Sequence, residues 1–76
     1  MKLTDKYDIS EWAYEQCRNG NDTPEMRNLI TDYWWIHSYC MNIKDIKEMW
    51  SKIKSPLWAK IYCREIKNRP EVRRYI

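Results

Sequence analysis

The three cysteines of this 76-residue chain, Cys17, Cys40 and Cys63, lie 23 residues apart. The same interval relates three tryptophans, three glutamates and three isoleucines, namely Trp12, Trp35 and Trp58, Glu25, Glu48 and Glu71, and Ile30, Ile53 and Ile76. Three cysteines share one phase of such a period by chance only about once in 500, so we interpret the chain as a stack of repeated units. The period predicts a single domain, 1–76, with units at 8–30, 31–53 and 54–76.

The local structure of a repeat is predicted most clearly by the third unit. Ser55 is a suitable N-cap and Pro56 fits the first position of a helix, while Pro70 can begin a second helix after a turn. Between the prolines lies an apolar stripe at helical spacing, made of Trp58, Ala59, Tyr62, Cys63 and Ile66. Each unit is therefore predicted to hold a helix of about 11 residues, a tight turn and a helix of about two turns.

The other two units follow the same pattern. Asp32 is the expected cap of the second long helix, and the first long helix is expected to end at Arg18 or Asn19, where Asn-Gly-Asn-Asp is typical of a turn. Each short helix carries two apolar residues that are expected to face inward, in the pairs Met26 and Ile30, Met49 and Ile53, and Val72 and Ile76. The predicted fold is all-α, with three degenerate 23-residue helix-turn-helix repeats in a compact short solenoid or helical bundle.

Composition narrows the class of protein. Five tryptophans and six tyrosines can fill the core of a short chain, and a single glycine suits helices. Three cysteines without a Cys-x-x-Cys pair argue against disulfides and zinc, so we expect reduced, buried thiols. No window of 18 apolar residues exists, which argues against a membrane span. Residues 1–6 contain no apolar export segment, so the expected location is the cytoplasm.

No set of residues has the pattern of an active site. His37 is the single histidine, has no nucleophile or carboxylate cluster near it in the sequence, and is expected on the surface. The repeated glutamates lie in the predicted first turns of the short helices, where their charge favours the helix dipole. Glycine-rich phosphate loops are absent from the sequence. We therefore expect no enzyme activity, no cofactor and no metal site.

Two tryptophans stand out because the equivalent positions of the other units are mostly charged. Trp34 shares its phase with a glutamate and a leucine, and Trp50 shares its phase with two arginines. Phases of this composition are expected to face solvent, and exposed tryptophans are common anchors at protein interfaces. We predict that Trp50 and Trp34 contact a protein partner. The alternative is that neighbouring units or the N-terminal segment cover these rings.

Charge is distributed unevenly along the chain. Residues 1–43 carry a net charge of −3 and residues 44–76 a net charge of +6. The basic half contains the remaining side chains predicted to contact a partner, namely Lys60, Arg64, Lys67, Arg69, Arg73 and Arg74. These residues form a solvated face, or bind an acidic protein surface or nucleic acid. Ile76 either folds inward like its equivalents or packs against another molecule, so self-association stays open.

Residues 55–76, which read SPLWAKIYCREIKNRPEVRRYI, resemble a short helical repeat of uncharacterised phage and large-virus proteins. That repeat reads roughly Pro-x-x-Ala-Tyr-x-Tyr-Ala-x-x-Val-Ile-x-Gly-Arg-x-Pro-Glu-x-Glu-x-x-Ile. The matching positions are Pro56, Ala59, Tyr62, Ile66, Arg69, Pro70, Glu71 and Ile76. Asn68 stands where the repeat has glycine, and the first two units match at fewer positions. The resemblance implies a virus-encoded all-α repeat protein of the host cytoplasm, with no catalytic residues to transfer.

The leading functional hypothesis is a stoichiometric inhibitor or modulator of a host protein, such as a defence, transcription or replication factor. The aromatic residues would anchor the target, and the basic half would steer an acidic surface toward them. Two other classes remain open. One is a small nucleic-acid-binding protein that uses the basic residues from Lys60 to Arg74 with aromatic stacking, and the other is a self-assembling structural protein.

Overall fold

The computed structural model describes residues 6–76, and this part of the chain is helical, without strands. Its six helices are α1 (Lys6–Arg18), α2 (Pro24–Leu29), α3 (Tyr33–Asn42), α4 (Lys47–Trp50), α5 (Pro56–Glu65) and α6 (Pro70–Arg73). The predicted all-α class is confirmed. Residues 1–5, on which most of the expectation about export rests, lie outside the described residues.

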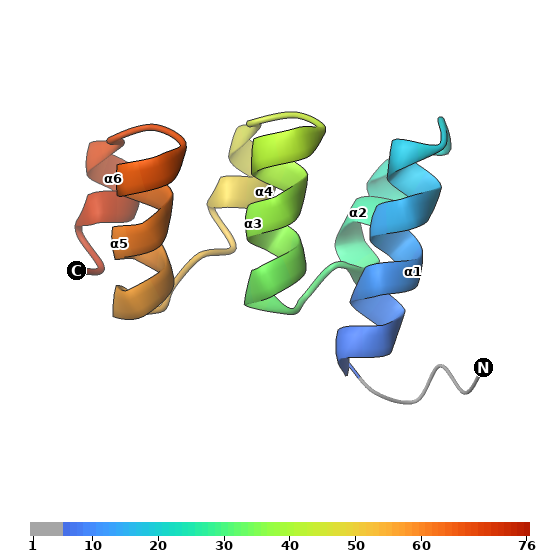
Figure 1. Ribbon diagram of the computed structural model, residues 1–76, viewed down its shortest axis with the longest axis horizontal. Coiled ribbons are helices and arrows are strands. Elements are labelled where there is room, and N and C mark those ends of the chain that lie inside the picture. The colour runs from blue at the N-terminus through green and yellow to red at the C-terminus, as the bar shows by residue number, and fades with distance from the viewer. Residues whose placement is uncertain (1–5) are drawn as a thin grey trace.

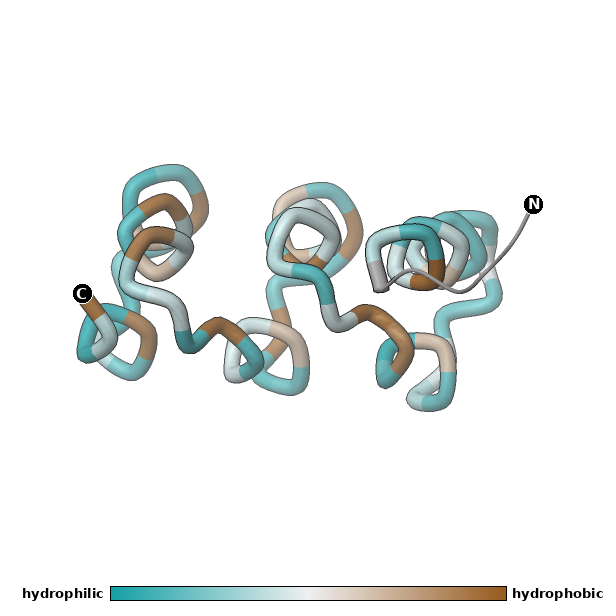
Figure 2. The backbone as a smooth tube through the Cα atoms, turned by 90° about the horizontal axis from the view of Figure 1, so that it is seen from below, coloured by the Kyte–Doolittle hydropathy of each residue, from teal (hydrophilic) through white to brown (hydrophobic). Residues whose placement is uncertain are grey.

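Long and short helices alternate along the chain and form two layers. The long helices α1, α3 and α5 lie side by side, and each is followed by a short helix that packs against it (Figure 1). Figure 2 looks along the long helices, which form one row, while α2, α4 and α6 form a second row. Among the long helices, α3 packs between α1 and α5. The core therefore lies between two rows of helices.

Several helix ends follow from local sequence. Helix α1 ends at Arg18, as predicted, and Gly20 follows with a φ of +108°, a left-handed value that glycine adopts without steric cost. The side chain of Asp32 accepts a hydrogen bond from the backbone amide of Trp34 at 3.0 Å, which confirms the predicted cap of α3. Ser55 occupies the cap position of α5 without a side-chain hydrogen bond. Helix α5 ends at Glu65, slightly earlier than expected.

Buried side chains come from all three pairs of helices. The largest fully buried apolar and aromatic residues are Tyr39, Tyr62, Ile30, Ile36, Met49, Ile53 and Val72. All three cysteines are free, with Cys17 and Cys40 buried and Cys63 half-buried. Burial raises the pKa of the Cys17 thiol to about 11 and that of Cys40 to about 12. Both buried thiols are therefore protonated at neutral pH and act as small packing groups.

The expected burial of Ile76 is wrong. Its equivalents Ile30 and Ile53 are almost completely buried, but the Ile76 side chain is 59% exposed. No helix lies beyond α6 in the described residues, so nothing there covers this position.

A separate expectation concerned the membrane. Within residues 6–76, no helix has both the length and the apolar character needed to cross a bilayer.

The small size of the Cys40 side chain is required by its surroundings. Replacing Cys40 with leucine adds volume to a site that is 4% exposed, and we expect this overpacking to lower the free energy of unfolding by roughly 1–3 kcal/mol. Urea denaturation followed by tryptophan fluorescence measures the change. The matched control is Cys63→Leu at the half-buried equivalent position, where a smaller loss is expected. Equal losses for the two variants would contradict this account of packing.

Candidate functional site

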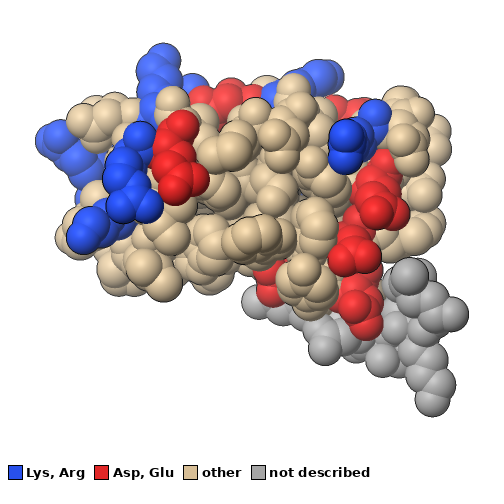
Figure 3. Space-filling view, in the orientation of Figure 1, with Lys and Arg blue, Asp and Glu red and all other residues tan. Residues whose placement is uncertain are grey.

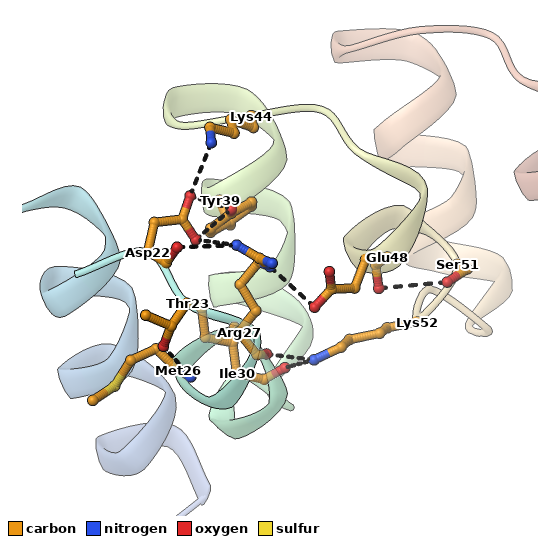
Figure 4. Close-up of polar contacts among 10 residues, drawn as sticks. All are labelled: Asp22, Thr23, Met26, Arg27, Ile30, Tyr39, Lys44, Glu48, Ser51 and Lys52. Atoms are coloured by element: carbon orange, nitrogen blue, oxygen red, sulfur yellow. Dashed lines mark hydrogen bonds and ion pairs between the residues drawn. The ribbon is translucent and has the colours of Figure 1, made fainter. Parts of the chain in front are cut away.

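A half-buried carboxylate joins the first pair of helices to the second. Asp22, in the loop after α1, accepts hydrogen bonds from the Tyr39 hydroxyl of α3 at 2.9 and 2.8 Å and from Arg27 Nη1 of α2 at 2.7 Å (Figure 4). Arg27 also donates through Nε to Glu48 of α4 at 3.0 Å. Lys52 completes this contact, because its ammonium group donates to the backbone carbonyls of Arg27 and Ile30 at 2.6 and 3.0 Å. These contacts tie the end of one helix pair to the next.

The same three chemical groups meet between the second and third pairs. The Tyr62 hydroxyl of α5 donates to Asp45 Oδ1 at 2.5 Å, and Arg69 Nη2 donates to Asp45 Oδ2 at 2.9 Å. Arg69 Nε also donates to the Tyr62 hydroxyl at 2.7 Å. The aspartate and the tyrosine lie 23 residues after their counterparts, whereas the arginine comes from a different position of the repeat. Each junction therefore contains aspartate, tyrosine and arginine, but the arginine is supplied differently.

The protonation of these groups suits a structural role. Burial, with the neighbouring carboxylates, raises the pKa of Tyr39 and of Tyr62, so both phenols stay neutral at physiological pH. Burial opposes ionisation of Asp22, but hydrogen bonds from Tyr39 and Arg27 outweigh it, and the pKa of this carboxyl is lowered. A hydrogen bond to Asp45 raises the pKa of Arg69. The first junction thus holds the ionised carboxylate of Asp22 against a neutral phenol and a permanent cation, and both phenols lack a tendency to release a proton near pH 7.

A second polar contact links adjacent long helices. Asn42 donates through its side-chain amide to the Tyr14 hydroxyl at 3.2 Å, and His37 Nε2 lies 3.1 Å from Glu65 Oε1. The hydrogen bond between His37 and Glu65 is the main reason why the pKa of Glu65 is lowered. Our expectation that His37 lies on the surface is wrong, because α5 covers it and leaves the residue only 8% exposed. Lys60, at the equivalent position of α5, is exposed.

Trp50 is not the exposed anchor that its phase predicted. The residue is 6% exposed, and the guanidinium carbon of Arg69 lies 4.9 Å from the centroid of its ring. The sequence indicated arginine at this phase in the other two units and so suggested solvent. In the fold, this phase faces the following helix pair, which covers the ring. The alternative expectation for Trp50, that a neighbouring part of the chain covers its ring, agrees with the structure, where the following helix pair does so.

Trp34 is exposed, as predicted, and it lies beside a groove between α3 and α5. The side chain is 53% exposed, and its ring meets that of Trp58 edge to face at a centroid distance of 6.3 Å. The groove has a volume of about 440 Å³ and is lined from the two helices by Trp34, Ser38, Met41, Trp58, Ile61 and Glu65. Met41, which also lines the groove, is 47% exposed. Sequence comparison between units identified Trp34 but missed the groove, because its second wall comes from the next unit.

The six predicted basic residues do not form one surface. Arg69 is engaged with Asp45, Tyr62 and Trp50, whereas the other five are exposed, namely Lys60, Arg64, Lys67, Arg73 and Arg74. Arg64 pairs with Glu65 at 3.3 Å at the margin of the groove. Figure 3 shows basic side chains gathered at the α5–α6 end of the molecule and a stripe of acidic side chains at the α1 end, with mostly uncharged surface between them.

No metal site can be built from the described residues, because they contain no cluster of three or more histidine, cysteine, aspartate or glutamate side chains suitable for binding an ion.

Comparison with protein-family models, with curated proteins and with solved structures found no match to this chain. The candidate site is therefore defined by its own chemistry, as an apolar groove with exposed aromatic and aliphatic side chains next to basic residues.

The ionised form of Asp22 stabilises the fold. Asp22→Asn keeps the shape of the side chain but removes the negative charge of the carboxylate that accepts hydrogen bonds from Tyr39 and Arg27. We expect a loss of about 2 kcal/mol in the free energy of unfolding at neutral pH. Because the pKa of Asp22 is lowered in the folded state, its contribution is complete above the ordinary aspartate pKa of about 4 and is lost as pH falls below that value. Urea titrations at about pH 7 and about pH 3 test the expectation that the two proteins converge in acid.

The control is Asp8→Asn in the first turn of α1, where a helix-dipole interaction of about 0.5 kcal/mol is all that is removed. A difference between wild type and Asp22→Asn that is the same at both pH values would contradict the role assigned to the charge.

Proposed function

We propose that this protein is a protein-binding module whose contact surface is the groove between α3 and α5. The observation that carries the proposal is the exposure of Trp34 and Met41, which both line the groove, in a fold that buries or half-buries most of its other large apolar side chains. Contiguous exposed apolar surface is uncommon on a small protein and is typical of interaction sites. Tryptophan in particular contributes large free energies at the centre of interfaces.

The chemistry of the margin defines the partner. Arg64 is exposed on α5 and pairs with Glu65, which lines the apolar groove, and the C-terminal half carries an excess of positive charge. A partner with apolar side chains flanked by acidic residues matches this arrangement, since complementary charges speed encounter and favour one orientation. Binding would be stoichiometric and would act by occlusion of the partner's surface. The resemblance of residues 55–76 to virus-encoded repeats supports a host protein as the target and inhibition or modulation as the outcome.

The proposal includes the repeat architecture. Equivalent contacts recur at an interval of 23 residues, with Tyr39 to Asp22 matched by Tyr62 to Asp45. The contacts of Tyr14 with Asn42 and of His37 with Glu65 form a second such pair. Three degenerate copies of one unit, stacked as a short solenoid, account for both sets of contacts. In this arrangement the groove lies between the outer surfaces of the second and third units.

A pair of exposed apolar residues tests the site. Trp34→Ala removes the centre of the proposed surface, whereas Leu29→Ala removes an exposed side chain of α2 in the other layer. Both immobilised variants are compared with wild type for retention of proteins from host lysate after nuclease treatment. A stoichiometric partner should bind wild type and Leu29→Ala alike and bind Trp34→Ala about 30-fold more weakly, the effect of losing about 2 kcal/mol at a hot spot.

Equal binding of that partner by all three proteins would reject the groove. Nucleic acid recovered without nuclease, with affinity that falls steeply with salt, would instead favour the basic residues as the functional surface. Circular dichroism spectra of the variants exclude misfolding as the cause of a loss.

A further inference from the structure

We propose that a second copy of this chain docks onto the α5–α6 end of the molecule through its α1–α2 end, so that copies join head to tail. This inference rests on the repeat architecture but uses surfaces other than the groove between α3 and α5. The surfaces in question are the two ends of the row of helix pairs in Figure 1.

The α5–α6 end exposes the positions that neighbouring helix pairs cover elsewhere. Tyr14 and His37 are 5% and 8% exposed, but Lys60 at the equivalent position is exposed. Arg27 and Trp50 are largely covered by the pair that follows them, whereas Arg73 is exposed. This end is therefore a third version of the surface that is buried at both junctions within the chain. Its residues are more polar than those at the covered positions, which suits a reversible contact.

The α1–α2 end exposes the complementary positions. Tyr39 and Tyr62 are fully buried by contact with the preceding pair, while Gln16 at the equivalent position of α1 is only half-buried. Met26 of α2 is also half-buried, although Met49, its equivalent, is completely buried. Glu25 is exposed beside it in the first turn of α2. The first helix pair thus exposes the surface that, in the second and third pairs, packs against the preceding pair.

Continuing the same spacing across two copies brings matched groups together. Within the chain, Arg27 Nε donates to Glu48 at 3.0 Å. The equivalent residues at a head-to-tail contact are Arg73 of one copy and Glu25 of the next, again an arginine and a glutamate. The positions of the aspartate and the tyrosine are filled by Asn68 and Gln16, whose amides can donate to and accept from each other. Both replacements avoid placing an unpaired carboxylate or a large phenol on an exposed end.

Charge selects this pairing of ends over the others. The basic side chains at the α5–α6 end and the acidic side chains over α1 give the two ends of the molecule opposite charge, which favours contact between unlike ends of neighbouring copies (Figure 3). A contact between different surfaces of the same chain does not close on itself unless the copies form a ring, so assembly continues with concentration. With a contact no larger than that between two helix pairs, we expect weak association.

Sedimentation velocity at rising concentration, up to about 1 mM, tests the proposal. We expect the weight-average sedimentation coefficient of wild type to rise without a plateau at the dimer and to fall back when salt is added. Arg73→Glu should weaken association about five- to tenfold because it faces two glutamates toward each other. Arg74→Glu changes the net charge equally at an adjacent exposed residue and serves as the matched control, with little effect expected.

Charge exchange gives the sharpest test. Glu25→Arg should weaken association as Arg73→Glu does, and the double variant, as well as an equimolar mixture of the two single variants, should recover it. A monomer at all concentrations, a closed dimer, or equal effects of Arg73→Glu and Arg74→Glu would overturn the proposal. Trp34→Ala, which tests the groove, should leave self-association unchanged. Loss of association in that variant would place the contact at the groove and also overturn the proposal.

Discussion

Tyr39 and Tyr62 each place a fully buried ring between two helix pairs and hold the loop of the preceding pair through a hydroxyl group. The short helices depend on these junctions. Helices of four to six residues do not persist alone in water, because so few hydrogen bonds cannot offset the entropy lost in nucleation. Asp22 and Asp45 lie just before α2 and α4, so the tyrosine contacts fix the turn from which each short helix begins. The order of α2 and α4 is thus a consequence of contacts made by the long helices α3 and α5.

The two junctions reach the same chemistry by different routes. At the first, Arg27 donates to Asp22 from the same helix pair and continues to Glu48 of the next. At the second, tryptophan replaces arginine at the equivalent position, and Arg69 approaches from the following pair. The guanidinium group of Arg69 covers the Trp50 ring while it binds Asp45. The second junction therefore lacks the arginine of the first but has another in its place, so that the half-buried carboxylate of Asp45 also has a cation beside it.

The sequence permitted accurate prediction of features that depend on a single helix pair. The end of α1 at Arg18 and the cap by Asp32 follow from local turn and capping chemistry. Predictions failed where burial depends on the next pair. His37 and Trp50 occupy phases that are charged or variable in other units, yet both face a following helix pair and are covered by it. The prediction for Ile76 was wrong in the opposite direction. Its equivalents Ile30 and Ile53 are buried where another helix pair follows, whereas Ile76 is exposed. The 23-residue period in the sequence predicts the orientation of a residue, whereas its exposure also depends on whether another helix pair lies beside it.

The candidate site lies on a surface where the three helix pairs differ in residue type. The surfaces that face neighbouring pairs keep their tyrosine, cysteine and isoleucine because a change there leaves a cavity or an unpaired polar group. The outer surface of the long helices has no such requirement. On α1 it carries Glu11 and Glu15, but on α3 and α5 the corresponding positions include Trp34 and Ile61. Stability does not require exposed tryptophan at the first of these positions, since a glutamate occupies it in α1. The apolar character of the groove therefore supports the proposed contact with another molecule.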